Sequence, residues 1–269
     1  MVGQSTFLGR LPVTVAAWLA LFYLAIPLVI VSAVSVTNTE FLAFPPQGLT
    51  LRWYSTVITD SSYVKSFLLS GYLAAISTVA AVFLGVPTAL ILARKEFPGR
   101  QAIGALFLSP LILPTIVLGV VVLQFSARAG FPRSFYALLL GHVIVTVPYV
   151  VRTTLASLAA GFDLATEEAA QDLGAAPMQV FFLVTLPQIK QGVITGALFA
   201  FLMSWINVEV SIFNTTPTLE TLPVKLMNYI QYNVDPSLAA VSATTIFIAV
   251  AAVLILDLTI GVEKATRGL

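Results

Sequence analysis

Few side chains in this chain of 269 residues could carry out chemistry. There is no cysteine, and there is one histidine, His142. The absence of cysteine excludes disulfide frameworks, thiol nucleophiles, redox pairs and thiolate metal sites, and one histidine is too few for a multi-histidine zinc site. The phosphate-binding sequence G-x-x-x-x-G-K-[S/T] does not occur either. We therefore predict that this chain has no catalytic residue, no metal site and no cofactor of its own.

The residues that could bind a partner form an acidic segment. Asp163 or Thr166 is suited to accept backbone hydrogen bonds at the start of a helix. Glu167 and Glu168 would then lie in its first turn, where the helix dipole favours carboxylates. Gly174 follows at the place where helices commonly end in a left-handed residue. This pattern predicts a short helix closed by a glycine turn.

A second short helix is expected directly after this turn. Pro177 suits the first turn of a helix, and the Phe-Phe-Leu run at 181–183 would give that helix an apolar face. Pro187 marks the start of the next apolar segment. Residues 152–191 therefore predict a compact helix–turn–helix loop, with an acidic end and an apolar face that suit it to bind a cytosolic partner.

The elements that must hold this loop follow from an unusually apolar composition. Hydrophobic residues make up 58% of the chain and charged residues 9%, whereas soluble domains have about 25% charged residues. A soluble enzyme is thereby excluded. A net charge of +1 argues against a nucleic-acid surface, which needs clustered Lys and Arg. The apolar runs show no period-2 alternation, which disfavours an outer-membrane barrel, so most of the chain is expected to lie in lipid as helices.

Six charge-free intervals are each long enough to span a bilayer, which takes roughly 20 apolar residues in a helix. Because backbone polar groups in lipid must bond within their own segment, we predict an all-α integral membrane protein with one transmembrane domain over residues 1–269. The first run is longer than the roughly 7–15 residues of a signal-peptide core, so an uncleaved first helix is expected. The expected spans are 13–36, 66–93, 102–125, 135–151, 192–213 and 239–262.

Lys and Arg near the ends of the spans indicate the orientation. With the N-terminus in the cytoplasm, the densest basic cluster, Arg94 and Lys95 with Arg100, lies inside, and the inside loops hold more Lys and Arg than the outside loops. We therefore expect both termini and the loop 152–191 on the cytoplasmic side. Pro110 and Pro114 are expected to kink or break the third span.

Polar residues within the expected spans are candidates for a solute pathway, because ionisable groups at membrane depth are costly. The candidates are His142 in the fourth span and Ser204, Asn207 and Glu209 in the fifth. Each has a structural alternative: packing for His142, interhelical hydrogen bonds for Ser204 and Asn207, and a place at the outer membrane surface for Glu209. Asp257, near the inner end of the last span, is expected to have a structural role.

The loop also carries a fixed spacing: Glu168-Ala169-Ala170, then Gly174, then Val184, Leu186 and Pro187. It resembles the EAA signature of permease subunits in binding-protein-dependent ABC importers, which reads E-A-A, three residues, G, nine residues and I-x-L-P. The single departure is valine in place of isoleucine. The resemblance implies a type I ABC importer fold in which this loop is a coupling helix that binds an ATPase subunit. The coupling residues that it carries over are Glu168, Ala169, Ala170, Gly174, Leu186 and Pro187.

Further stretches resemble the second permease of the spermidine/putrescine-type branch. They are Leu-Arg-Trp-Tyr at 51–54, Gly-His and Pro-Tyr within 141–149, Thr-Leu-Pro-Val-Lys at 221–225 and Asp-Pro-Ser at 235–237. Polyamine permeases commonly carry an adjacent acidic pair where this chain has Ile206 and Asn207. The resemblance implies a small solute of the polyamine kind, but the missing pair counts against a polyamine. Ferric, thiamine and aminophosphonate importers have similar permeases and stay as alternatives.

The same resemblance implies partners and a location. A second permease subunit, expected to be a different chain, would complete the pathway. A dimer of cytosolic ATPase subunits would bind ATP and Mg²⁺, and an extracytoplasmic substrate-binding protein would deliver the solute. The chain is accordingly expected to be a multi-pass protein of a prokaryotic cytoplasmic (inner) membrane, in contact with lipid and with no nucleic acid.

Three other functions explain less of the sequence. A stand-alone secondary transporter would show inverted repeats and carboxylates near the membrane midplane. An integral-membrane enzyme would cluster His, Asp or Glu, and a purely structural subunit would not need the loop 152–191. The sequence has no repeat of fixed period, so an importer permease is the preferred hypothesis and a secondary transporter is the alternative.

Overall fold

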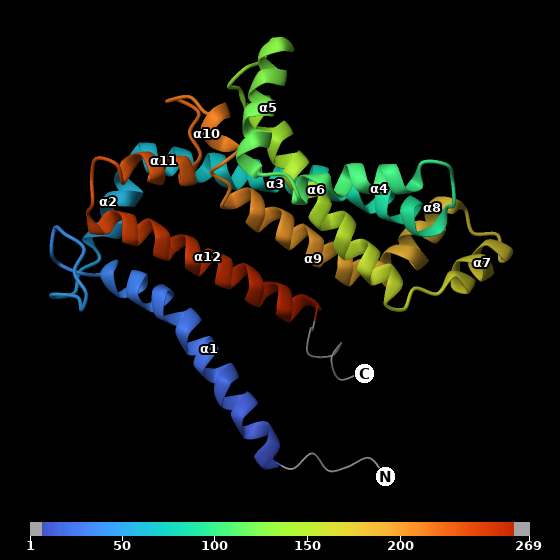
Figure 1. The fold of residues 1–269 in the computed structure, drawn as a ribbon, viewed down its shortest axis with the longest axis horizontal. Helices are drawn as coiled ribbons and strands as arrows, with labels where there is room; N and C mark the ends of the chain where they lie inside the picture. The colour runs from blue at the N-terminus through green and yellow to red at the C-terminus, as the bar shows by residue number, and fades with distance from the viewer. Residues whose placement is uncertain (1–6, 261–269) are drawn as a thin grey trace. The chain divides into compact units, whose positions relative to one another are not determined.

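The computed structural model describes residues 7–260, with side chains described from 12 to 254. This part of the chain consists of helices and loops and contains two isolated β-bridges but no strand, which confirms the predicted all-α class (Figure 1). It groups into a smaller unit, residues 7–64 with 228–252, and a larger unit, residues 65–227 with 253–260. The elements are α1 (Phe7–Val34), α2 (Arg52–Thr59), α3 (Ser61–Arg94), α4 (Arg100–Leu108), η1 (Ser109–Leu111), α5 (Thr115–Arg128), α6 (Phe135–Ala159), α7 (Leu164–Asp172), α8 (Pro177–Val180), η2 (Phe181–Thr185), α9 (Leu186–Trp205), α10 (Ser211–Asn214), α11 (Leu222–Tyr229) and α12 (Pro236–Ile260).

Within the described residues, five stretches of helix are long and apolar enough to cross a membrane, and a bent pair of helices makes a sixth if the pair is one span. Length and composition alone thus support about six spans, as predicted. The five are Pro12–Val34, Ser61–Arg94, Phe135–Ala159, Pro177–Trp205 and Pro236–Leu254, and the bent pair is Arg100–Leu111 with Thr115–Arg128.

The helix expected over 102–125 is broken in the structure, as its two prolines predicted. Its two halves differ in direction by 105° across the break. Pro110 lies in the 3-10 turn η1, and Pro114 precedes α5 with an extended ψ of 123°. Because proline has no N–H and its ring clashes with the preceding turn, two prolines four residues apart favour a break at this place.

The loop between the fourth and fifth spans is shorter than the expected 152–191. α6 continues to Ala159 and α9 begins at Leu186, which leaves residues 160–185 between them. Arg152 and Lys190, whose charges suggested the ends of these spans, lie inside the two helices. A long charged side chain can reach polar surroundings from within a helix, so its charge marks a helix end poorly.

The fifth span also ends earlier than the expected residue 213. α9 stops at Trp205, residues 206–210 are not helical, and the short α10 follows. The side-chain Oδ1 of Asn207 accepts the backbone N–H of Val210 at 2.9 Å, a bond that competes with the helical pattern. In the sixth span, residues 261–262 and the side chain of Asp257 lie outside what the structure describes.

α6 and α9 approach closely because small residues line their contact in the larger unit. A Cβ on Gly192 would lie 2.6 Å from the carbonyl oxygen of Thr153, and one on Gly196 would lie 2.9 Å from the Cα of Val150. Ala200 extends the same face and is fully buried. This spacing of small residues is typical of helix pairs in membranes, and here it joins the two helices whose ends carry residues 160–185.

In the smaller unit, α2 is held by the segment that follows α1. The indole N–H of Trp53 donates to the carbonyl oxygen of Thr37 at 2.8 Å, and the hydroxyls of Tyr54 and Ser35 lie 2.7 Å apart. The Trp-Tyr pair that stood out in the sequence therefore anchors a loop.

Asp235 lies at the start of α12 in the same unit. Its Oδ1 accepts the backbone N–H of Ser237 at 2.8 Å, and its Oδ2 accepts the hydroxyl of Tyr229 at 2.6 Å. Burial raises the pKa of Asp235, but the hydrogen bonds from Ser237 and Tyr229 outweigh burial and hold this pKa below its ordinary value. The ionised carboxylate is therefore the form that suits this helix start.

Candidate coupling loop and pathway residues

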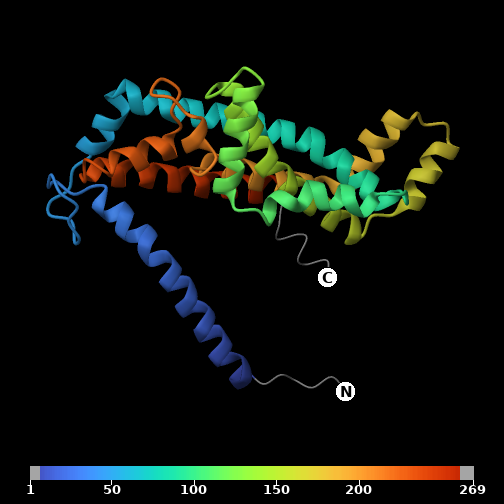
Figure 2. The ribbon, with the colours of Figure 1, turned by 45° about the horizontal axis from the view of Figure 1, so that its top comes forward.

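Residues 160–187 form a knob at the adjoining ends of α6 and α9, with α7 and α8 projecting from them (Figures 1 and 2). The carboxylate of Asp163 accepts the backbone N–H of Ala165 at 3.0 Å, whereas Thr166 donates its hydroxyl to the carbonyl oxygen of Asp163. Of the two cap candidates in the sequence, Asp163 is therefore the one that satisfies a free N–H at the start of α7.

Gly174 ends α7 in a left-handed turn. Its φ is +89°, its N–H donates to the carbonyl oxygen of Gln171 at 2.8 Å, and the N–H of Ala175 donates to that of Ala170 at 3.1 Å. This pair of bonds is the Schellman arrangement, in which a residue without a Cβ is favoured at the left-handed position. The glycine of the sequence motif thus sets the direction in which the chain leaves α7.

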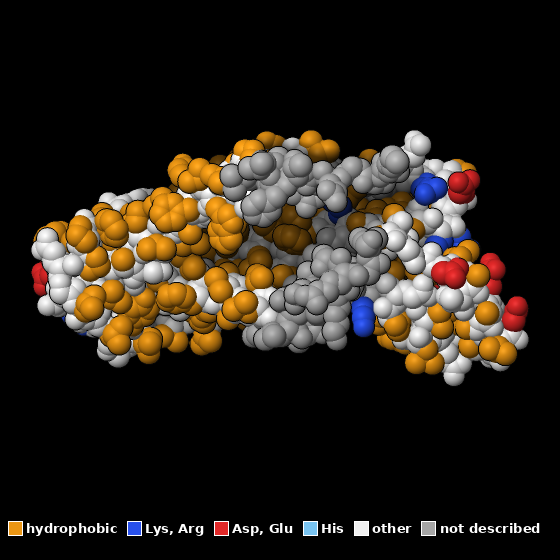
Figure 3. Space-filling model, turned by 90° about the horizontal axis from the view of Figure 1, so that it is seen from below, with side chains coloured by type: hydrophobic (Ala, Val, Ile, Leu, Met, Phe, Trp, Pro, Cys, Tyr) orange, Lys and Arg blue, Asp and Glu red, His pale blue; other side chains and the backbone are white. Residues whose placement is uncertain are grey.

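The outer surface of the knob exposes large apolar side chains. Leu173 is 90% exposed and Leu183 is 74% exposed, and Met178 and Phe182 are also exposed. On the face drawn in Figure 3, acidic and basic side chains gather at the end that carries the knob, with hydrophobic side chains among them. An exposed apolar patch with a charged rim is typical of a surface that binds another protein.

The predicted coupling residues are all part of this knob. Glu168 and Ala169 in α7 are exposed, Ala170 is half-buried, and the turn at Gly174 is exposed. Leu186 and Pro187 are the first residues of α9, which continues directly from the π-helical stretch η2. The residues therefore lie along one continuous element, but whether an ATPase binds it stays a prediction at this point.

Glu167 lies in the first turn of α7, as predicted, but its side chain is buried, which the sequence did not show. Its side chain is 7% exposed, and its Oε1 lies 2.7 Å from the Nη2 of Arg94 at the end of α3. The hydroxyl of Thr185 donates to the same oxygen. Arg94 is 73 positions away in the chain, so no local pattern could have identified this pair.

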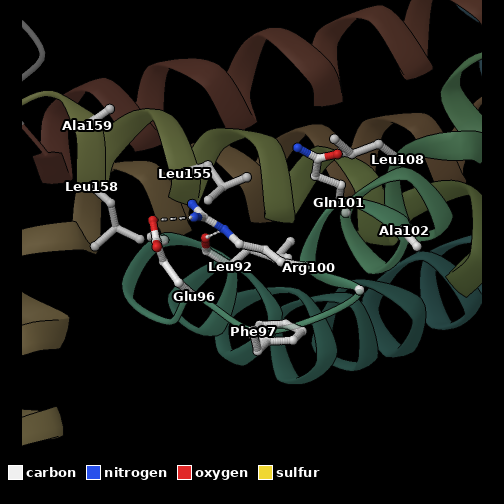
Figure 4. Close-up of a pocket in the computed structure, with 13 residues that line it drawn as sticks. Leu92, Glu96, Phe97, Arg100, Gln101, Ala102, Leu108, Leu155, Leu158 and Ala159 are labelled. Carbon is white, nitrogen blue, oxygen red and sulfur yellow. Dashed lines mark hydrogen bonds and ion pairs between the residues drawn. The ribbon is translucent and has the colours of Figure 1, made fainter.

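A pocket of about 1150 Å³ opens between the end of α3, the start of α4 and the end of α6 (Figure 4). The Nε of Arg100 donates to the carbonyl oxygen of Leu92 at 2.8 Å, and its Nη1 lies 3.7 Å from the Glu96 carboxylate. Phe97, Leu155 and several further apolar side chains form the rest of the wall. No local sequence pattern indicates this pocket, because residues from three separate helices build it.

His142 lies at the centre of a buried chain of hydrogen bonds in the larger unit. Its Nδ1 is 2.7 Å from the hydroxyl of Ser204, and its Nε2 is 2.9 Å from that of Ser211. Ser211 donates to the carbonyl oxygen of Asn207 and Ser204 accepts from Ser77. The chain connects α3 and α6 to the non-helical segment after α9.

The pathway candidates therefore separate into two groups. His142, Ser204 and Asn207 are 2%, 4% and 5% exposed and belong to the buried chain, whereas Glu209 is exposed. The backbone at Glu209 packs against α5, because a Cβ on Gly119 would lie 2.5 Å from the Glu209 carbonyl oxygen. Among the described side chains, no three His, Asp or Glu are grouped so that they could hold a metal ion.

Three comparisons with known proteins agree with one another. The family model for the inner membrane component of binding-protein-dependent transport systems matches residues 81–262. The spermidine/putrescine transport system permease protein PotC of Escherichia coli (strain K12) is 30% identical over 246 residues, which cover 91% of this chain and 92% of that protein. The putrescine transport system permease protein PotI of the same strain is 32% identical over 248 residues, which cover 87% and 88%.

A solved structure supports the fold. A bacterial ABC transporter involved in the import of the acidic polysaccharide alginate matches with a TM-score of 0.68 and 16% identity, covering 95% of this chain and 99% of that one. The family match and the fold confirm the resemblance stated from the EAA spacing. The chain belongs to the family of inner membrane components of binding-protein-dependent transport systems.

Proposed function

We propose that this chain forms part of a solute pathway across the inner membrane and couples it, through the knob at 160–187, to ATP hydrolysis in separate subunits. The observation that carries the proposal is the knob itself. It is an acidic helix closed by a glycine turn, with Glu168 and Leu173 exposed on the same short segment of chain. It is mounted on α6 and α9, which pack closely through small residues.

A contact between α3 and α7 supports the proposed orientation. The Arg94–Glu167 pair joins the end of α3 to the knob, so the basic cluster at 94–100 and the knob lie at the same membrane side. Clustered Lys and Arg favour the cytoplasmic side. We infer that the knob faces the cytoplasm, with both termini on that side and the loop 130–134 outside.

The knob would bind an ATPase subunit through close contact, a charge-assisted bond and burial of apolar side chains. The small side chain of Ala169 lets a partner surface approach closely, and Glu168 can form a charge-assisted bond to a basic residue. Leu173 and Leu183 offer apolar area that a groove in the partner would bury. Opening and closing of the ATPase dimer, which holds ATP and Mg²⁺, would then move the permease as a rigid body.

A second permease subunit and an extracytoplasmic binding protein complete the proposed system. The solute pathway would lie between the two permease chains, and the binding protein would release the solute into it. This arrangement fits the family, whose members are components of binding-protein-dependent systems. The proposed multi-subunit system replaces the alternative hypothesis that this chain is a stand-alone secondary transporter.

The proposed solute is a small cationic amine. The relatives PotC and PotI are named for spermidine and putrescine transport. Ile206 and Asn207 supply no carboxylate where polyamine permeases carry an acidic pair, but Glu209 stands exposed in the same non-helical segment. A carboxylate there can attract an ammonium group, which Ile206 cannot.

The coupling proposal is tested with Leu173→Glu in the reconstituted complex. Burying a leucine side chain contributes about 1.5–3 kcal/mol, so a charge at this place should weaken ATPase binding at least about tenfold. Tyr232→Glu is the matched control, because Tyr232 is 84% exposed in a different loop. Retention of the ATPase subunits during purification is measured. If Leu173→Glu retains them as Tyr232→Glu does, the knob is not the docking element.

The substrate proposal is tested with Glu209→Gln. Putrescine should stimulate ATP hydrolysis by the complex with its binding protein, sulfate should not, and the variant should lose much of the putrescine response. Hydrolysis that responds to sulfate and not to putrescine would reject a cationic solute. A full putrescine response in the variant would remove Glu209 from the pathway.

A further inference from the structure

Glu167 and Glu168 are neighbours in α7 but have opposite surroundings. The side chain of Glu167 is 7% exposed, whereas Glu168 is exposed. Successive residues of a helix point about 100° apart, so one of the two faces the protein and the other faces solvent. A buried carboxylate is costly unless it is paired, and the partners of Glu167 therefore matter.

Three segments meet at this carboxylate. Its Oε1 accepts hydrogen bonds from the guanidinium of Arg94 at 2.7 Å and from the hydroxyl of Thr185. Arg94 is the last residue of α3, and Thr185 is the last residue of the π-helical stretch η2, which continues directly into α9. The ring of Phe162 lies 4.8 Å under the Arg94 guanidinium and keeps it in place.

The first half of α7 has further bonds to α9. The side chain of Gln188 accepts the backbone N–H of Asp163 at 3.1 Å and donates to the hydroxyl of Thr166 at 2.8 Å. These bonds are exposed, where competition with water weakens them, whereas the bonds of Glu167 are shielded. The start of α7 is therefore fastened to the spans, while its second half, from Glu168 to the turn at Gly174, presents most of its side chains to solvent.

We propose that Glu167 is a positioning residue: with Arg94 and Thr185 it fastens α7 to the ends of α3 and α9, so that any displacement of the knob moves both helices together. The three residues are called the latch below. The inference rests on the proposed function of the knob. It assigns the two glutamates separate tasks, because Glu168 is free to touch a partner and Glu167 is not.

The latch is tested by a distance measurement that needs no known substrate. The chain has no cysteine, so spin labels can be placed at two introduced cysteines, Lys95→Cys beyond the end of α3 and Asp172→Cys at the end of α7, both exposed positions. The distance between the labels is measured in the assembled complex, first without nucleotide and then trapped with ATP and vanadate.

The latch predicts that this distance is the same in both states of the otherwise wild-type complex. Glu167→Gln keeps the shape of the side chain but removes its charge, and the distance should then shift or broaden measurably on trapping. Glu96→Gln is the matched control, because it removes an exposed carboxylate just after the end of α3 and outside the latch. It should behave like the unsubstituted complex. Arg94→Gln combined with Glu167→Gln should add little to either change alone, because the two act as one unit.

Two results would overturn the latch. One is a distance that changes on trapping in the complex with both glutamates present, a measurement that needs no latch variant to fold. The other is an intact Glu167→Gln complex whose distance stays constant. Failure of the proposed function would look different: the ATPase subunits would stay bound to Leu173→Glu, whatever the labels report.

Discussion

Replacing Gly174 by proline is the sharpest test of the turn that closes α7. The glycine has φ +89°, and its N–H donates to Gln171 at 2.8 Å. Proline holds φ near −65° and has no N–H, so the turn and its bond are lost together, at a cost of about 3 kcal/mol or more. A cost of about 3 kcal/mol reduces the population of the native turn by roughly a hundredfold.

Alanine at position 174 tests the left-handed backbone by itself, without steric crowding. A Cβ on Gly174 would meet nothing within 4 Å, so the cost of Gly174→Ala is the left-handed backbone alone, about 1–2 kcal/mol. Asparagine tolerates this conformation better. The stimulation of ATP hydrolysis by the binding protein should therefore fall in the order glycine, asparagine, alanine and proline.

Gly130 provides a control with nearly the same geometry in another loop. It has φ +86°, and a Cβ added to it would likewise meet nothing within 4 Å. Its N–H donates to Ala127 at 3.3 Å, and the N–H of Phe131 donates to Ser126 at 2.9 Å. Gly130→Pro should carry a similar local cost but keep the stimulation. The reasoning is refuted if Gly174→Pro keeps full stimulation with the ATPase bound, or if Gly130→Pro abolishes it equally.

Three further predictions concern thermal unfolding of the purified permease. Gly196→Ala should lower the free energy of unfolding by about 1–3 kcal/mol, because the added Cβ would lie 2.9 Å from a backbone atom of α6. Gly104→Ala, whose Cβ would have no neighbour closer than 3.8 Å, should raise the free energy of unfolding by up to about 1 kcal/mol. Equal shifts in the unfolding temperature of the two variants would contradict the packing argument. His142→Leu leaves the buried hydroxyls of Ser204 and Ser211 without their imidazole partner. It should lower the free energy of unfolding by about 1–3 kcal/mol for each group left unsatisfied. An unchanged midpoint of thermal unfolding would show that this chain of hydrogen bonds contributes nothing to stability. Asp235 has a lowered pKa, so its contribution to the stability of the fold is present above the unfolded-state pKa and is lost as the pH falls through the folded-state pKa. The stability difference between the wild type and Asp235→Asn should therefore shrink as the pH is lowered from 7 to about 3. A stability difference that stays constant with pH would contradict this.

Features that depend on residues close together in the chain were predictable from the sequence. The apolar spans follow from composition, because each span must be apolar along its own length. The helix start at Asp163 and the turn at Gly174 follow from bonds between residues only a few positions apart. The break at Pro110 and Pro114 belongs to the same class, since proline acts on its own turn.

The sequence of α9 also contains one signal of helix packing. Gly192, Gly196 and Ala200 recur at every fourth residue and line one face of α9. A repeat of small residues in an apolar helix indicates a close helix contact. The partner on α6 could not be named from this repeat, because the spacing describes one helix only.

The order of residues was enough to establish that this chain lies in a membrane, carries a loop suited to a partner and lacks the phosphate loop of an ATPase. The folded arrangement was needed to learn which of two adjacent glutamates is buried, and that His142 joins Ser204 and Ser211 in one chain of hydrogen bonds. The difference comes from distance along the chain. Composition, caps and turns act over a few residues, whereas Arg94 reaches Glu167 across 73 positions and only the packing of the helices brings them together.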